Sequence, residues 1–173
     1  IKLARKASPD YLPALVTASD LNIIAGNADA AARDSAAYLQ IVKTNTVAYA
    51  NAILAEAMRR NYDAAISWID EALQNARLPI SDVESLVSPD VQDLTHGFKL
   101  SVVDSDFLLA LRYTKAFLYA MRGDERFEML LDEADQSDRD RPYSRNAYLA
   151  ALNWQWLIVR GQGFHDMQTA QAK

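Results

Sequence analysis

The chain has 173 residues, half of them hydrophobic, with a net charge of −5 and no cysteine, which fits one soluble globular domain and argues against disorder. The acidic balance argues against a nucleic-acid surface, and the lack of cysteine excludes disulfides and thiolate metal sites. No apolar run reaches the roughly 20 residues of a membrane-spanning helix and no signal peptide is visible; because the chain opens at Ile1, we expect a fragment or a processed form.

Four helices are predicted in the first 76 residues. Ser8 and Pro9 form a typical helix start, because the serine hydroxyl can cap the helix and proline fits its first turn. Gly26 follows the first apolar stretch and is expected to close that helix in the left-handed conformation. Apolar residues recur every three or four positions from Tyr62 to Leu73, which predicts one buried face. The expected helices cover about 10–25, 29–42, 46–59 and 62–76.

The helical pattern is interrupted between residues 77 and 104. Pro79 and Pro89 break it, and Ser88 before Pro89 is a further helix start. We therefore expect an irregular insertion over 77–104 that contains one or two short helices and a connector.

Helical periodicity resumes at Ser105 and predicts a long helix that ends at Gly123. A partner helix to about residue 135 and a charged loop over 136–141 should follow. The next helix is expected over 146–160, closed by Gly161 and Gly163, with 164–172 as the start of a further hairpin. The predicted fold is a single all-α domain over 1–173, with hairpins at about 10–42, 46–76, 105–135 and 144–172.

Two of the predicted turns, Gly26-Asn27 and Arg60-Asn61, are 34 residues apart, which is a typical period of stacked two-helix repeats. The run from Asn61 to Ile66, followed by Ile69 and Ala72-Leu73, resembles the tetratricopeptide repeat family. Looser copies are Gly26-Asn27 with Ala31, and Gly123-Asp124 with Ala116 and Tyr119. The resemblance implies an α-solenoid, a right-handed superhelix of stacked antiparallel hairpins that binds peptides or proteins in a concave groove.

The resemblance also implies which residues line that groove. In the family, the first helix of each hairpin faces the concave side, and these positions fall here on Val16, Asp20, Ala50, Leu54, Tyr113, Phe117, Tyr148 and Gln155. Family members that clamp a peptide carboxylate carry Lys, Arg and Asn there, whereas this set is mostly apolar or aromatic. We therefore expect the groove either to accept an apolar or helical ligand or to be filled by the insertion.

The predicted helix over 146–160 is apolar on almost every side and carries Trp154 and Trp156. It is interpreted either as a helix buried between neighbours or as a surface for a partner, because exposed Trp residues are common binding anchors. Both interpretations hold if a further hairpin stacks against it.

The sequence shows no catalytic arrangement. His96 and His165 lack the spacing of a zinc site and are interpreted as surface or capping residues. Neither a phosphate-binding glycine loop nor a nucleophile elbow is present. An acidic cluster is interpreted as a solvated helix face; it consists of Asp124, Glu125, Glu128, Asp132, Glu133 and Asp135.

The sequence therefore predicts a non-catalytic scaffold without cofactor or metal, which binds another protein or a peptide through its groove or its Trp-bearing helix. Self-association is left open, and neither nucleic acid nor membrane insertion is expected. The alternative is a ligand-binding or regulatory module whose insertion closes over a small apolar molecule. Alanine-rich hairpins suggest a bacterial origin, with the compartment open between cytoplasm and periplasm.

Overall fold

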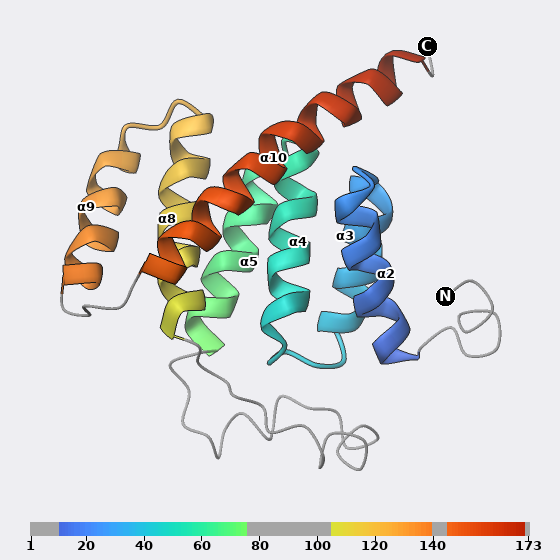
Figure 1. The fold of residues 1–173 in the computed structure, drawn as a ribbon, viewed down its shortest axis with the longest axis horizontal. Coiled ribbons are helices and arrows are strands. Elements are labelled where there is room, and N and C mark those ends of the chain that lie inside the picture. The colour runs from blue at the N-terminus through green and yellow to red at the C-terminus, as the bar shows by residue number, and fades with distance from the viewer. Residues whose placement is uncertain (1–10, 76–104, 140–144, 172–173) are drawn as a thin grey trace.

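The computed structural model describes residues 11–75, 105–139 and 145–171. Within these ranges the fold consists of α-helices and has no β-strand, which confirms the all-α prediction for this part of the chain (Figure 1). The helices are α2 (Leu12–Ile24), α3 (Ala28–Leu39), α4 (Thr46–Met58), α5 (Tyr62–Asn75), α8 (Ser105–Met121), α9 (Arg126–Arg139) and α10 (Arg145–Gln171).

Three tight turns of the same design join α2 to α3, α4 to α5, and α8 to α9. Each has one residue in the left-handed conformation, namely Gly26 (φ 74°), Arg60 (φ 61°) and Gly123 (φ 72°). In each turn the next residue donates its backbone N–H to the carbonyl five positions earlier, at 2.8 Å, 2.9 Å and 3.0 Å. This bond is the mark of a Schellman motif, which satisfies the last carbonyls of the preceding helix. The helix ends expected at Gly26 and Gly123 are thereby confirmed.

The helices pack in pairs along the chain. Helix α2 lies against α3, α4 against α5, and α8 against α9, while α3 also packs on α4 and α5 on α8 (Figure 1). Small side chains allow these close approaches, because Ala31, Ala55 and Ala65 have no exposed surface. The packing between α2 and α3 includes a buried polar pair, Ser19 and Ser35, whose hydroxyl oxygens are 2.5 Å apart.

Helix α10 differs most from the sequence-based expectation. The predicted helix end at Gly161 and the predicted hairpin over 144–172 are wrong, because residues 145–171 form one continuous helix of 27 residues. It runs diagonally across the other helices (Figure 1) and packs on α8, α4 and, near its carboxyl end, α2. These are the first helices of the three pairs. Neither glycine stops the helix, because tertiary packing at this point outweighs the low helix propensity of glycine.

Other predicted boundaries differ in detail. Helix α9 continues to Arg139, so the loop expected from residue 136 is wrong for 136–139. The helix start at Ser8, the insertion over 77–104 and His96 lie outside the described residues.

Candidate partner-binding surface

The inner face of α10 is anchored in the core along the middle of the helix. Ile158 has no exposed surface and belongs to the main hydrophobic core. Trp154 packs edge-on against Phe107 of α8, with the ring centroids 5.9 Å apart. Towards the start of α10, Ala147 and Ala151 form a second apolar cluster with residues of α8 and with Ala134 of α9. Helix α10 is thereby packed on several elements that are distant from it in the sequence.

The carboxyl half of α10 is held by contacts to the turn between α4 and α5. Gly161 lies directly against the side chain of buried Met58, where a Cβ atom would overlap it. The side-chain amide of Gln162 is buried and donates to the carbonyl of Ala57 at 2.9 Å and to the hydroxyl of Tyr62 at 3.0 Å. These contacts explain why a Gly-Gln-Gly sequence lies inside a helix rather than at its end.

Two further contacts extend this attachment to the end of the described helix. The Phe164 ring lies 3.1 Å from the place that a Cβ atom would take at Gly26, so α10 covers the turn between α2 and α3. Arg60 pairs with Asp166 at 2.8 Å, and this ion pair is exposed. A hydrogen bond to Arg60 lowers the pKa of Asp166.

Because α10 crosses the first helices of the pairs, it leaves a hollow on each of its sides. The α9 hollow lies between α8, α9 and α10, has a volume of about 400 Å³, and includes Phe117, Phe127, Leu131 and Leu152 in its lining. The α2 hollow is bordered by α2, α4 and α10, measures about 340 Å³, and is lined among others by Ile24, Val47, Leu54 and Trp154. Both hollows are mainly apolar, with one carboxylate each.

Those carboxylates are engaged in hydrogen bonds. In the α9 hollow, the Tyr113 hydroxyl donates to Asp135 at 2.9 Å. In the α2 hollow, the side-chain amide of Asn51 donates to Asp20 at 2.8 Å. The polar groups thus tie neighbouring helices together, and the remaining lining offers apolar contact.

The structure divides the predicted groove residues between these two hollows. Tyr113, Phe117 and Gln155 line the α9 hollow, whereas Asp20, Ala50, Leu54 and Trp154 line the α2 hollow. Val16 is half-buried on α2 and lines neither. Tyr148 belongs to α10, and its side chain lies outside the described part. The predicted set is therefore not one continuous groove wall, because α10 lies between its members.

The outer face of α10 carries a row of exposed apolar side chains, namely Leu149, Leu152, Trp156 and Val159, between 41% and 57% exposed. They are spaced by three, four and three residues, the spacing that places side chains on one side of a helix. Only Trp156 of this row was predicted as a site residue. The sequence could not identify the other three, because this helix is apolar on almost every side. The three-and-four spacing therefore does not distinguish its outer face from its inner face.

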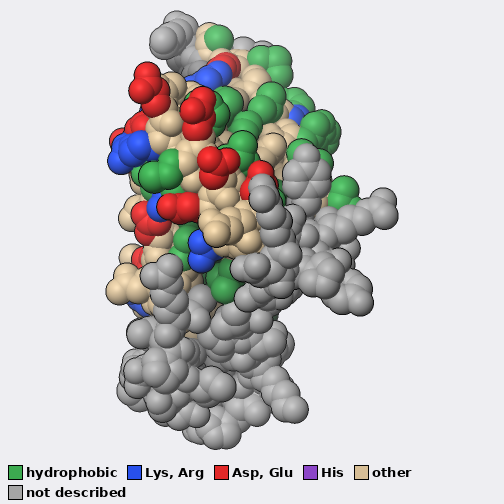
Figure 2. All heavy atoms as spheres, turned by 90° about the vertical axis from the view of Figure 1, so that its left-hand side faces the viewer, with side chains coloured by type: hydrophobic (Ala, Val, Ile, Leu, Met, Phe, Trp, Pro, Cys, Tyr) green, Lys and Arg blue, Asp and Glu red, His purple; other side chains and the backbone are tan. Residues whose placement is uncertain are grey.

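The charged surroundings of this row are uneven. Arg160 directly follows the apolar row and stacks over the rings of Trp156 and Phe164 at 5.1 and 5.3 Å. In the view onto α9, acidic side chains stand beside a group of hydrophobic ones (Figure 2). Glu125, Glu128, Asp132 and Glu133 are exposed there, as expected for a solvated helix face.

Asp124 departs from that description. Its carboxylate accepts hydrogen bonds from the guanidinium groups of Arg126 and Arg122, at distances of 2.7 to 2.9 Å. These bonds hold the pKa of Asp124 well below its usual range. The Asp124 carboxylate also accepts a hydrogen bond from the backbone N–H of Arg126 at 3.1 Å. It therefore stabilises the turn before α9.

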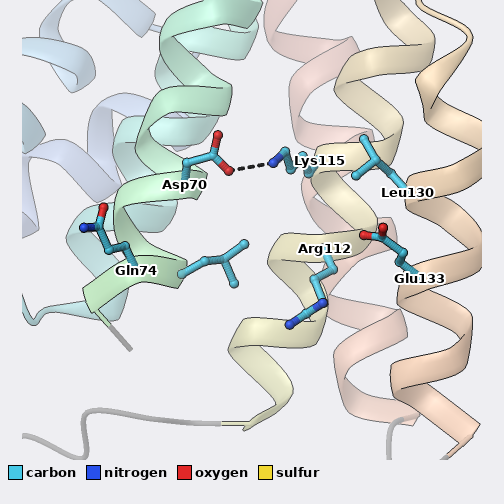
Figure 3. Close-up of a pocket in the computed structure, with 7 residues that line it drawn as sticks. Asp70, Gln74, Arg112, Lys115, Leu130 and Glu133 are labelled. Carbon is cyan, nitrogen blue, oxygen red and sulfur yellow. Dashed lines mark hydrogen bonds and ion pairs between the residues drawn. The ribbon is translucent and has the colours of Figure 1, made fainter. Parts of the chain in front are cut away.

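A charged pocket that the sequence did not predict lies on α5, α8 and α9, away from α10 (Figure 3). It has a volume of about 460 Å³ and is lined by Asp70, Leu73, Gln74, Arg112, Lys115, Leu130 and Glu133. Lys115 donates to Asp70 at 2.6 Å and so links α8 to α5. The contributing residues come from three helices on both sides of 77–104, which is why spacing along the chain gave no signal for this pocket.

Chemistry at the other candidate residues is limited. Within the described ranges, no three His, Asp or Glu side chains are grouped in a way that could hold a metal ion. His165 lies half-buried on α10 beside Asp166. No described helix combines the length and the apolar character that crossing a membrane requires.

No protein-family model matches this chain, and comparisons with curated proteins and with solved structures found no significant match. The tetratricopeptide repeat therefore stays a resemblance of motif.

Proposed function

We propose that this protein is a non-catalytic interaction module that binds a protein partner through the outer face of α10 and its flanking hollows. The observation that carries the proposal is the row of four exposed apolar side chains on a helix whose other side is anchored in the core. Exposed large apolar groups at regular helical spacing, with hollows beside them, are typical of protein-binding surfaces.

The same proposal includes a tetratricopeptide-like stack as the framework. It is supported by the 34-residue spacing of Gly26 and Arg60 and by the identical hydrogen bonding of the three turns. In such a stack the first helices of the pairs face one side, and here α10 packs on those helices. The binding surface is then the covering helix rather than the helices beneath it.

A test of this function compares partner capture by the wild-type chain and by variants. Trp156→Glu and Val159→Glu each place a charge in the exposed row and leave the inner face unchanged. Both variants should therefore fold, which circular dichroism checks. Met129→Glu is the matched control, because Met129 is equally exposed (54%) but lies on α9. We expect the wild type and the Met129 variant to capture the same proteins from native extract. Both α10 variants should fail to capture them. Identical capture by all four chains, together with self-association that neither α10 variant weakens, would refute it.

A second candidate function is binding of a small apolar molecule in the α2 hollow. The observation that favours it is the lining of Ile24, Val47, Leu54 and Trp154 around about 340 Å³, a volume within the range of small-molecule sites. A ligand of this kind would raise the thermal midpoint of the wild type but not of Val47→Glu. A screen of apolar compounds with no such selective shift would count against it.

A further inference from the structure

We propose that the partner of the outer face of α10 is a second copy of this chain, bound with the two α10 helices antiparallel. The inference rests on the proposed function, since it names the partner of the same surface.

The spacing of the row suits a symmetric contact. Leu149, Leu152, Trp156 and Val159 follow one another at three, four and three residues, so the row reads the same in both directions. A two-fold axis near residue 154 then pairs Leu149 of one copy with Val159 of the other, and Leu152 with Trp156. Alternating spacings of three and four are those of helices that pack side by side over a shared apolar seam.

The charge along α10 favours the same partner. Residues 146–159 contain no Asp, Glu, Lys, Arg or His, although the whole chain carries a net charge of −5. Two copies that meet here bring uncharged stretches together and keep their acidic surfaces apart. A hydrophobic seam of this kind would not be opposed by like-charge repulsion.

The antiparallel orientation also brings Arg160 of one copy towards the acidic helix α9 of the other, although Arg145 begins the same half of α10. The amino half of α10 lies beside the acidic helix α9, since Ala134 of α9 clusters with Ala147 and Ala151. In the antiparallel pair, Arg160 of one copy reaches the amino half of the α10 of the other, and hence its α9 hollow with Asp135. A parallel pair would instead bring the two Arg160 side chains together.

The test measures the mass of the purified chain in solution. The wild type, of 19.3 kDa, should sediment as a concentration-dependent dimer. Trp156→Glu and Val159→Glu should each raise the dissociation constant by at least about tenfold, as expected for apolar anchors at the centre of an interface. Met129→Glu should leave it unchanged. A wild type that stays monomeric up to millimolar concentration, or a dimer that both α10 variants retain, would overturn the inference.

Orientation is tested with spin labels, because the chain has no cysteine of its own. Asn153 is exposed and lies beside the row, one residue from the proposed axis, whereas Met167 lies 13 residues away. At 1.5 Å per residue, labels at Met167→Cys should be about 39 Å apart along the helix axis, and labels at Asn153→Cys only about 3 Å. Equal distances for the two pairs would contradict the antiparallel arrangement even if a dimer forms.

The two proposals fail in different ways. If the wild type is monomeric but loses captured proteins on Trp156→Glu, the second copy is wrong while the binding surface stands. If neither self-association nor capture depends on Trp156 and Val159, the proposed function is wrong as well.

Discussion

Gly161 of α10 and Met58 of α4 lie in direct contact, so that a Cβ atom at position 161 would be only 2.4 Å from the Cγ atom of Met58. Met58 is 1% exposed. The contact joins two helices that are more than a hundred residues apart in sequence. It fixes α10 close to α4 and makes the glycine a packing residue.

We therefore expect Gly161→Ala to destabilise the fold by about 1–3 kcal/mol through overpacking. Gly163 is the matched control, because a Cβ atom there would meet nothing within 4 Å. Gly163→Ala should stabilise the protein by about 0.5–1 kcal/mol through its higher helix propensity. Urea unfolding of both variants tests whether the two changes shift the free energy of unfolding in opposite directions. Equal stabilisation by both would show that the contact with Met58 is absent.

The buried amide of Gln162 should contribute more than the exposed ion pair next to it. Gln162→Leu removes two hydrogen bonds and leaves the carbonyl of Ala57 without this donor, which should lower the free energy of unfolding by about 1–3 kcal/mol. Asp166→Asn removes the negative charge of the exposed pair with Arg60 and should have a clearly smaller effect. Chemical denaturation ranks the two variants, and the reverse order would contradict the burial of Gln162.

The hydroxyl pair of Ser19 and Ser35 should behave as one unit. Both side chains are fully buried and both hydroxyls lie within reach of the carbonyl of Ala31, that of Ser35 at 2.8 Å and that of Ser19 at 3.4 Å. Either hydroxyl can donate the bond of 2.5 Å between them. Each single change to Ala should lower the stability by about 1 kcal/mol, while the double change should cost less than the sum. A double-mutant cycle measured by urea unfolding tests this, and strict additivity would mean that the two hydroxyls do not interact.

Stability should fall at alkaline pH because of Tyr49. Burial, followed by the negative charge of Glu71, raises the pKa of Tyr49, whereas tyrosines in the unfolded chain ionise near pH 10. The contribution to stability is complete below about pH 10 and is lost as the pH rises towards the folded-state pKa, because the unfolded chain then binds fewer protons.

The measurement is the free energy of unfolding between about pH 9 and 11. In Tyr49→Phe the free energy of unfolding should fall less steeply over this range, because one tyrosine with a raised pKa is removed. Some decline should remain, because burial also raises the pKa of Tyr38. Parallel pH profiles for the variant and the wild type would show that Tyr49 ionises equally in both states.

The sequence could predict those elements whose signals are local. The apolar stripe from Tyr62 to Leu73 marked α5. Gly26 and Gly123 marked two helix ends, because glycine has no Cβ atom and adopts the left-handed conformation there without steric cost. Arg60 has the same conformation as these glycines. Its residue type does not indicate a turn, and the turn was predicted there from the 34-residue spacing to Gly26.

The path of α10 could not be predicted in this way. From the local sequence, Gly161 and Gly26 equally predict a helix end. Only the position of Met58 in space shows that Gly161 makes a close packing contact instead. For the same reason, the sequence predicts one groove wall, whereas α10 separates Phe117 from Leu54. Packing between distant segments decided both outcomes.

The most direct test is amide hydrogen exchange across α10, because binding by its outer face requires the helix to be a fixed part of the fold. Amides of residues 150–163 should exchange as slowly as those of α4, since Ile158, Gly161 and Gln162 are buried. Rapid exchange of α10 while α4 stays protected would contradict this claim. It would show a detachable helix, and the partner-binding surface would then be the helices α2, α4 and α8 beneath it.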